Sequence, residues 1–151
     1  MKRIYFTLFA LIAISLSVSA QQRYTWEQYG LSFSVPKSFQ ILENTAESFE
    51  AENEEMSLTI ELLDYEGLSP EFMGTLLGQM AKDSGMRNAE VGELVLTTLE
   101  GAYIEGEIKG VNVIYIVLMD TDSNIALLGS IVYEDGYEVP ATRIVNSFAI
   151  E

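Results

Sequence analysis

The sequence predicts an α+β domain in which helices cover an antiparallel β-sheet on both faces, a three-layer α/β/α sandwich. The runs at 113–119 and 125–132 are apolar on both faces, so both faces of the central strands must be covered. Two amphipathic segments, at 69–85 and 136–148, supply helices for the cover, and the aromatic segment at 24–29 can add to it.

Strands are expected in the first half of the domain, at 29–35, 39–43, 46–51 and 56–62. The first and last of these alternate apolar with small or polar residues, the period of a half-buried strand. Pro36 ends the first strand because proline cannot donate a ladder hydrogen bond. The polar turn at 52–55 precedes the last strand and predicts a hairpin.

The period then changes to that of a helix over 69–85. Ser69 is a good N-cap residue, and Gly85 is a natural stop. Gly74 and Gly78 weaken helix propensity by roughly 1 kcal/mol each. Their spacing of four residues suggests that this helix approaches the sheet closely.

Strand patterns return in the second half, at about 92–99, 101–109, 112–120 and 124–134. Connections of a few residues make these strands antiparallel neighbours. A second helix is expected from 136 to 148, with a buried stripe of apolar residues.

The first 20 residues have the three parts of a secretory signal peptide. Lys2 and Arg3 form a positive start, residues 4–18 are largely apolar, and small residues end at Ala20. The alternative is an uncleaved membrane anchor, but the apolar run is shorter than the roughly 20 residues of a spanning helix. We therefore expect residues 21–151 to form a single exported domain, periplasmic or extracellular, with no stable membrane anchor after cleavage.

The composition limits the partners. The chain has 8 Lys and Arg against 23 Asp and Glu, so removal of two basic residues with the signal would leave a net charge of −17. Such a surface repels nucleic acid and anionic lipid. The acidity keeps an exported protein soluble, and it leaves positive partners or divalent cations open.

The segment 29–36, Tyr-Gly-Leu-Ser-Phe-Ser-Val-Pro, resembles the start of PsbP-like domains, and the closing Ile144-Val145-Asn146-Ser147-Phe148 is similar to their end. That superfamily includes photosystem extrinsic subunits, a Ran-binding nuclear transport factor and small exported bacterial proteins of unknown role. The resemblance implies a binding or assembly subunit, and it carries over no functional residue. A Ran-binding role would contradict the signal peptide.

The absence of His and Cys excludes a Ser-His-Asp triad, a Cys nucleophile and His or Cys zinc sites. Glu105 and Glu107 lie two apart on one strand and could form a carboxylate pair for glycoside hydrolysis. The alternative is that they line an edge or solvent-facing strand. We expect no catalytic residue, no cofactor-binding residue and no cofactor.

Two acidic segments have some features of a calcium site. Asp120, Asp122 and Asn124 resemble half of a calcium loop, but Ile125 and Ile131 stand where that loop needs glycine and an acid. The preferred interpretation is a polar hairpin turn. Weak surface binding there, or at 52–55, is the alternative, and no metal site is predicted.

Tyr24 and Trp26 share one side of an extended segment and could form a binding hot spot, or simply seal the end of the sheet. Met73 and Met80 are expected in the core; exposed, they would suggest an adaptable binding surface.

These observations predict an exported, non-enzymatic binding or assembly module that engages a protein partner, whose contact residues the sequence does not identify. A small-ligand or divalent-cation carrier is the alternative, and a carboxylate-dependent hydrolase is the third hypothesis.

Overall fold

The computed structural model describes residues 21–27, 29–63, 69–120, 122–123 and 125–150. The expected signal peptide at 1–20 lies outside the described residues. Among these residues no helix has the length and apolar character needed to cross a membrane.

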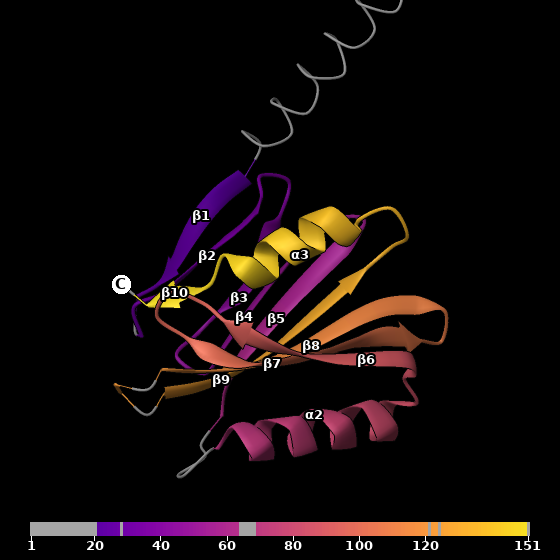
Figure 1. The fold of residues 1–151 in the computed structure, drawn as a ribbon. Helices are drawn as coiled ribbons and strands as arrows, with labels where there is room; N and C mark the ends of the chain where they lie inside the picture. The colour runs from indigo at the N-terminus through magenta and orange to yellow at the C-terminus, as the bar shows by residue number, and fades with distance from the viewer. Residues whose placement is uncertain (1–20, 28, 64–68, 121, 124, 151) are drawn as a thin grey trace, which may run out of the picture.

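A seven-stranded antiparallel sheet forms the centre of the domain, with the strand order β3-β4-β5-β9-β8-β7-β6 (Figure 1). Its strands are β3 (Gln40–Asn44), β4 (Ser48–Glu52), β5 (Met56–Leu63), β6 (Arg87–Val95), β7 (Glu100–Ile108), β8 (Val111–Asp120) and β9 (Ile125–Tyr133). The doubly apolar runs become β8 and β9 in the interior of the sheet, as predicted. Each strand pairs with its neighbour in an antiparallel register.

Helix α2 (Pro70–Ser84) covers one face of this sheet (Figure 1). It begins where the Ser69 hydroxyl accepts a hydrogen bond from the Phe72 amide at 3.3 Å, and it ends at Gly85 with φ +72°. Met73 and Leu77 are buried against the sheet strands β7 and β8.

The two glycines inside α2 face away from the sheet. A Cβ added at Gly74 or Gly78 would have nothing within 4 Å. The expectation that these glycines allow a close approach of the helix to the sheet is therefore wrong.

The opposite face is covered by a second, three-stranded sheet and by helix α3 (Glu138–Asn146) (Figure 1). The second sheet has the order β1-β2-β10, with β1 (Gln21–Trp26), β2 (Leu31–Pro36) and β10 (Ala149–Ile150). Phe33 of β2 is fully buried and packs edge-on against Phe49 of β4, with ring centroids 5.0 Å apart. The largest hydrophobic cluster thus lies between the two sheets and α3.

The predicted three-layer α/β/α sandwich is wrong. Strands account for 57% of the structure and helices for 19%, which makes it a β-rich fold with two sheets and few helices. The cause is the N-terminal aromatic segment, whose residues pair with β2 along its whole length. The covering layer expected to be helical is therefore mostly a second sheet.

Ser147 fastens the end of α3 to the second sheet. Its hydroxyl accepts a hydrogen bond from the Ser34 amide at 2.8 Å and donates to the Ile144 carbonyl at 2.7 Å. Helix α3 is thereby held by a contact between residues 113 positions apart in the chain.

Candidate functional site

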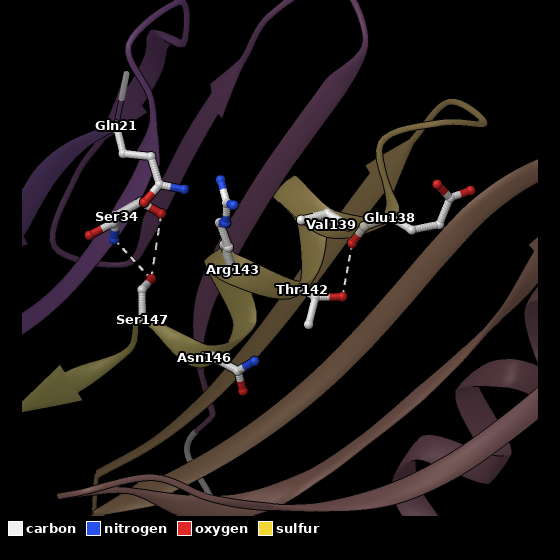
Figure 2. Close-up of a pocket in the computed structure, with 8 residues that line it drawn as sticks. All are labelled: Gln21, Ser34, Glu138, Val139, Thr142, Arg143, Asn146 and Ser147. Atoms are coloured by element: carbon white, nitrogen blue, oxygen red, sulfur yellow. Dashed lines mark hydrogen bonds between the residues drawn. The ribbon is translucent and has the colours of Figure 1, made fainter. Parts of the chain in front are cut away.

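Helix α3 separates two hollows on the same side of the molecule. The first, the Arg143 hollow, has a volume of about 470 Å³ and lies between α3 and the second sheet. It is lined by Gln21, Ser34, Glu138, Val139, Thr142, Arg143, Asn146 and Ser147 (Figure 2). Its volume is in the range of pockets that hold small molecules.

Arg143 is the cation of this hollow. The side chain is half-buried, and it extends from α3 toward the side on which Gln21 and Ser34 lie (Figure 2). Within the described part of the chain, no carboxylate pairs with it and no acceptor receives a hydrogen bond from it. The nearby Glu138 carboxylate points away from the guanidinium (Figure 2) and accepts a hydrogen bond from the Gly136 amide at 3.3 Å.

The second hollow, the Tyr103 groove, has a volume of about 380 Å³ and lies between α3 and the β6 end of the large sheet. It is lined by Glu93, Leu94, Tyr103, Glu105, Ile114, Thr142, Val145 and Asn146. Leu94, Ile114 and Val145 are buried and give it an apolar floor. The Tyr103 ring occupies the space above Gly92, where an added Cβ would lie 2.4 Å from a ring carbon.

Carboxylates surround this groove. Glu105 of β7 is half-buried and stands directly opposite Glu90 of β6 in the strand register. Like charges placed opposite each other destabilise a strand pair, so this arrangement costs stability. Burial raises the pKa of the Tyr133 hydroxyl above its usual value, and the negative charge of Glu105 raises it further, as do Glu138 and Asp135.

Strand β6 forms the outer edge of the large sheet (Figure 1). Its residues Glu93 and Leu94 line the Tyr103 groove. Val91 and Val95 on this strand are 61% and 81% exposed. Glu90 and Glu93 are exposed as well. An edge strand presents unpaired backbone N–H and C=O groups, so β6 offers a template for a further strand.

The carboxylate pair proposed from the sequence is divided between two environments. Glu105 and Glu107 are two residues apart on β7, as predicted. Glu105 lines the Tyr103 groove, whereas Glu107 is exposed and stands between Arg87 and Asn112 in the strand register. The two do not line one hollow together.

Asp120 belongs to the β8–β9 hairpin turn. One carboxylate oxygen accepts from the Asp122 amide at 3.1 Å, and the other accepts from the Ser123 hydroxyl at 2.5 Å. The preferred interpretation as a polar turn is confirmed by these contacts. Asn124 lies outside the described residues. Over the ranges that the structure describes, no group of three or more acidic residues is placed to hold a metal ion.

Of the acidic segment at 52–55, Glu52 ends β4 and residues 53–55 form the β4–β5 turn. The Asn53 side chain organises it by accepting hydrogen bonds from the amides of Glu55 and Met56, at 3.0 and 2.8 Å.

The two aromatic residues proposed as a hot spot seal the fold. Trp26 is 3% exposed and donates from its indole nitrogen to the Thr45 carbonyl at 2.8 Å. Tyr24 packs between Phe33 and Phe49, with ring centroids about 6 Å from each. The sealing interpretation is confirmed.

The methionines of α2 differ in exposure. Met73 is 1% exposed and belongs to the core under α2, as predicted. Met80 is half-buried.

Sequence reasoning missed Arg143, Tyr103 and the edge position of β6. One signal for Arg143 was its lack of an acid three or four residues away on its own helix, which leaves a guanidinium unpaired locally. The sequence has no comparable signal for Tyr103, because the groove depends on which strand ends the sheet.

The fold places this chain among proteins built on a large antiparallel sheet with a helix on one face and a mixed cover on the other. It is similar to the Saccharomyces cerevisiae Ran-binding protein Mog1p, with a TM-score of 0.57 and 14% identity, over 86% of this chain and 95% of that one. A mutant of the protein Mog1 gives the same TM-score and coverage at 13% identity.

A protein from Bacteroides thetaiotaomicron, 14% identical, aligns with a TM-score of 0.49 over 87% of this chain and 48% of its own length. No protein-family model matches the chain, and no curated protein sequence matches it. At these identities the likeness to Mog1 shows a shared fold.

Proposed function

We propose that this protein is a non-enzymatic binding module that accepts an extended, basic segment of a protein partner along β6. The observation that carries the proposal is the exposed edge of β6 beside the acidic Tyr103 groove. Strand addition to a sheet edge is a recurrent mode of peptide recognition, in which backbone hydrogen bonds give affinity and neighbouring pockets give specificity.

The length of β6 suits this mode. The strand runs from Arg87 to Val95 with a register shift between Arg87 and Glu90. Its regular part, Glu90 to Val95, is six residues long and spans about 20 Å at the usual rise per residue. Val91 and Val95 would bury their exposed side chains against an added strand or the residues that flank it. The groove next to β6 would accept a side chain over its apolar floor.

Charge selects the partner. Glu90 and Glu93 are exposed on β6, and Glu105 lies in the groove behind them. A second copy of the chain would bring the same carboxylates and the same net negative charge, so self-association along this edge is opposed. Lysine or arginine side chains would pair with these carboxylates, and the Tyr103 ring can also attract a cation through its face.

The likeness to Mog1p supports the class of function. A protein described as Ran-binding shares this fold at low identity, and fold analogy alone cannot transfer the partner. We infer that the chain is a PsbP-like module exported through the leader predicted at 1–20, where its partner would be another exported protein.

Site-specific photo-crosslinking tests the proposal in the native host. A photo-reactive phenylalanine analogue at Val91 on β6 is compared with one at Leu42 on β3, the opposite edge of the sheet. The two positions are 61% and 57% exposed, so they capture passing proteins equally well. We expect a discrete adduct from Val91, and sequencing of the crosslinked peptide to give a Lys- or Arg-rich extended segment.

Equal adducts from Val91 and Leu42 would contradict the proposal, because they would mean that β6 holds no special partner. An adduct at Val91 whose crosslinked segment is acidic or helical would also overturn it. The double variant Glu90→Lys, Glu93→Lys should remove the Val91 adduct, whereas Glu52→Lys, Glu54→Lys on the β4–β5 turn makes the same charge change and should leave it intact.

A further inference from the structure

The Arg143 hollow has features that the proposed partner on β6 does not use. It holds a half-buried guanidinium in a chain with 23 acidic and 8 basic residues, yet no described carboxylate neutralises it. Arginine carries five N–H donors in a planar fork, and here they face a hollow of about 470 Å³. A cation kept without a partner in so acidic a chain is available to a ligand.

We propose that the Arg143 hollow is a binding site for a carboxylate group. The guanidinium fork matches the two oxygens of a carboxylate and can hold them with two parallel hydrogen bonds. The side-chain amides of Gln21 and Asn146 line the same hollow, and neither makes a hydrogen bond within the described residues. They supply neutral donors that add no charge.

The hydroxyl groups that line the hollow already make hydrogen bonds within the protein. Thr142 donates to the Glu138 carbonyl at 2.8 Å, and Ser147 is held by its bonds to Ser34 and Ile144. The bond between Ser34 and Ser147 joins the end of α3 to the second sheet, whereas the bond of Thr142 stays within α3 (Figure 2).

The charge of the chain favours a singly charged ligand group over a doubly charged one. A net charge of −15 opposes anions, and this opposition grows with the charge of the ligand. Screening at physiological salt limits the reach of the field to about 8 Å, so one cation inside a hollow can still dominate locally. A singly charged carboxylate is therefore opposed less by the charge of the chain than a phosphate dianion is.

The carboxylate could belong to a free small molecule or to the C-terminus of a peptide. Three probes separate these sources: propionate, N-acetyl-alanyl-alanine, and the C-terminal amide of the same dipeptide. Each is titrated into the full chain, and binding is followed by the NMR signals of the Arg143 Nε–H group and the Ser147 amide. Inorganic phosphate serves as a fourth probe for anion preference.

We expect saturable shifts of both signals with the free-acid dipeptide or with propionate, and none with the dipeptide amide. Arg143→Gln should weaken binding at least about tenfold, which is the scale of a lost charge-assisted pair. Lys82→Gln is the matched control, since it also removes a cation from the last turn of a helix, and it should bind as the wild type does. Arg143→Lys keeps the charge without the fork and should be intermediate.

Several results would overturn the proposal: a linear, non-saturating response, equal shifts with the amide probe, tighter binding of phosphate than of any carboxylate, or retention of affinity in Arg143→Gln. Thermal unfolding of each variant shows whether it is folded. The readout uses Arg143 and Ser147, which lie on α3 and at its C-terminal end, away from β6. A negative result here therefore leaves the β6 adducts unaffected, and failure of the β6 proposal leaves this titration unaffected.

Discussion

Replacement of Gly101 by alanine should strongly destabilise the fold. Gly101 of β7 stands opposite Leu94 of β6 and Leu118 of β8, so it joins the edge strand to the interior of the sheet. A Cβ at this position would lie 1.8 Å from the Val117 carbonyl oxygen, well inside the 3.0 Å below which such contacts do not occur.

The size of the effect follows from what must move. The obstructing atom belongs to the backbone of β8, which is paired on both sides, so it cannot turn away as a side chain can. Overpacking costs about 1–3 kcal/mol and sometimes more, and a backbone obstruction belongs at the upper end, at about 3 kcal/mol. For a domain of this size that lowers the melting temperature by roughly 10 °C.

Gly78→Ala is the matched control, because it adds the same methyl group at an exposed position in α2 with nothing within 4 Å. Helix propensity predicts a gain of about 1 kcal/mol. Urea unfolding monitored by Trp26 fluorescence gives both free energies of unfolding. The reasoning is refuted if Gly101→Ala unfolds at the same urea concentration as Gly78→Ala or the wild type.

Three further results are expected. The raised pKa of Tyr133 means that the folded state holds the hydroxyl proton of this residue more tightly than the unfolded state does. The resulting contribution to stability is present below pH 10 and is lost as the pH rises above it. Tyr133→Phe should therefore flatten the decline of the unfolding free energy at alkaline pH. Ser147→Ala removes the acceptor of the Ser34 amide and should cost about 1–2 kcal/mol in thermal unfolding, with Thr142→Ala as the control whose bond stays within α3. If the leader is removed before Gln21, conversion of that residue to pyroglutamate removes both the α-ammonium charge and the side-chain amide of Gln21 at the Arg143 hollow, and should weaken carboxylate binding by roughly twofold to fivefold. An unchanged affinity would place Gln21 away from the ligand.

The parts of the fold that the sequence predicts well are those with a local physical signal. Ser69 and Gly85 mark the ends of α2 because capping chemistry involves residues a few positions apart. The doubly apolar runs of β8 and β9 indicate interior strands because burial on both faces requires apolar residues on both faces.

The second sheet has no such signal. Strand β10 has two residues, and its pairing partner Ser32 lies 117 residues from Ala149. Period and composition report what a segment buries, but they do not report which distant segment pairs with it. The error in predicting an α/β/α sandwich arises from this limit.

The residues of the candidate site could not be grouped from the sequence for the same reason: they come from segments far apart in the chain. Arg143 and Gln21 come together only because β1 and α3 pack on the same face of the large sheet (Figure 1). Val91 resembles a half-buried strand residue in the sequence, and its 61% exposure follows from the position of β6 at the edge. Strand order is set by contacts between segments far apart in the chain.

The most direct test of the binding proposal is a titration of the isotopically labelled protein with a peptide of alternating lysine and valine, followed by amide exchange at β6. We predict that every second amide between Glu90 and Val95, the regularly paired part of β6, gains protection, that β3 does not change, and that added salt weakens the effect. Glu90→Lys, Glu93→Lys should abolish the protection, and Glu52→Lys, Glu54→Lys should not. Protection at β3, or an equal response to a peptide of alternating glutamate and valine, would contradict strand addition at β6.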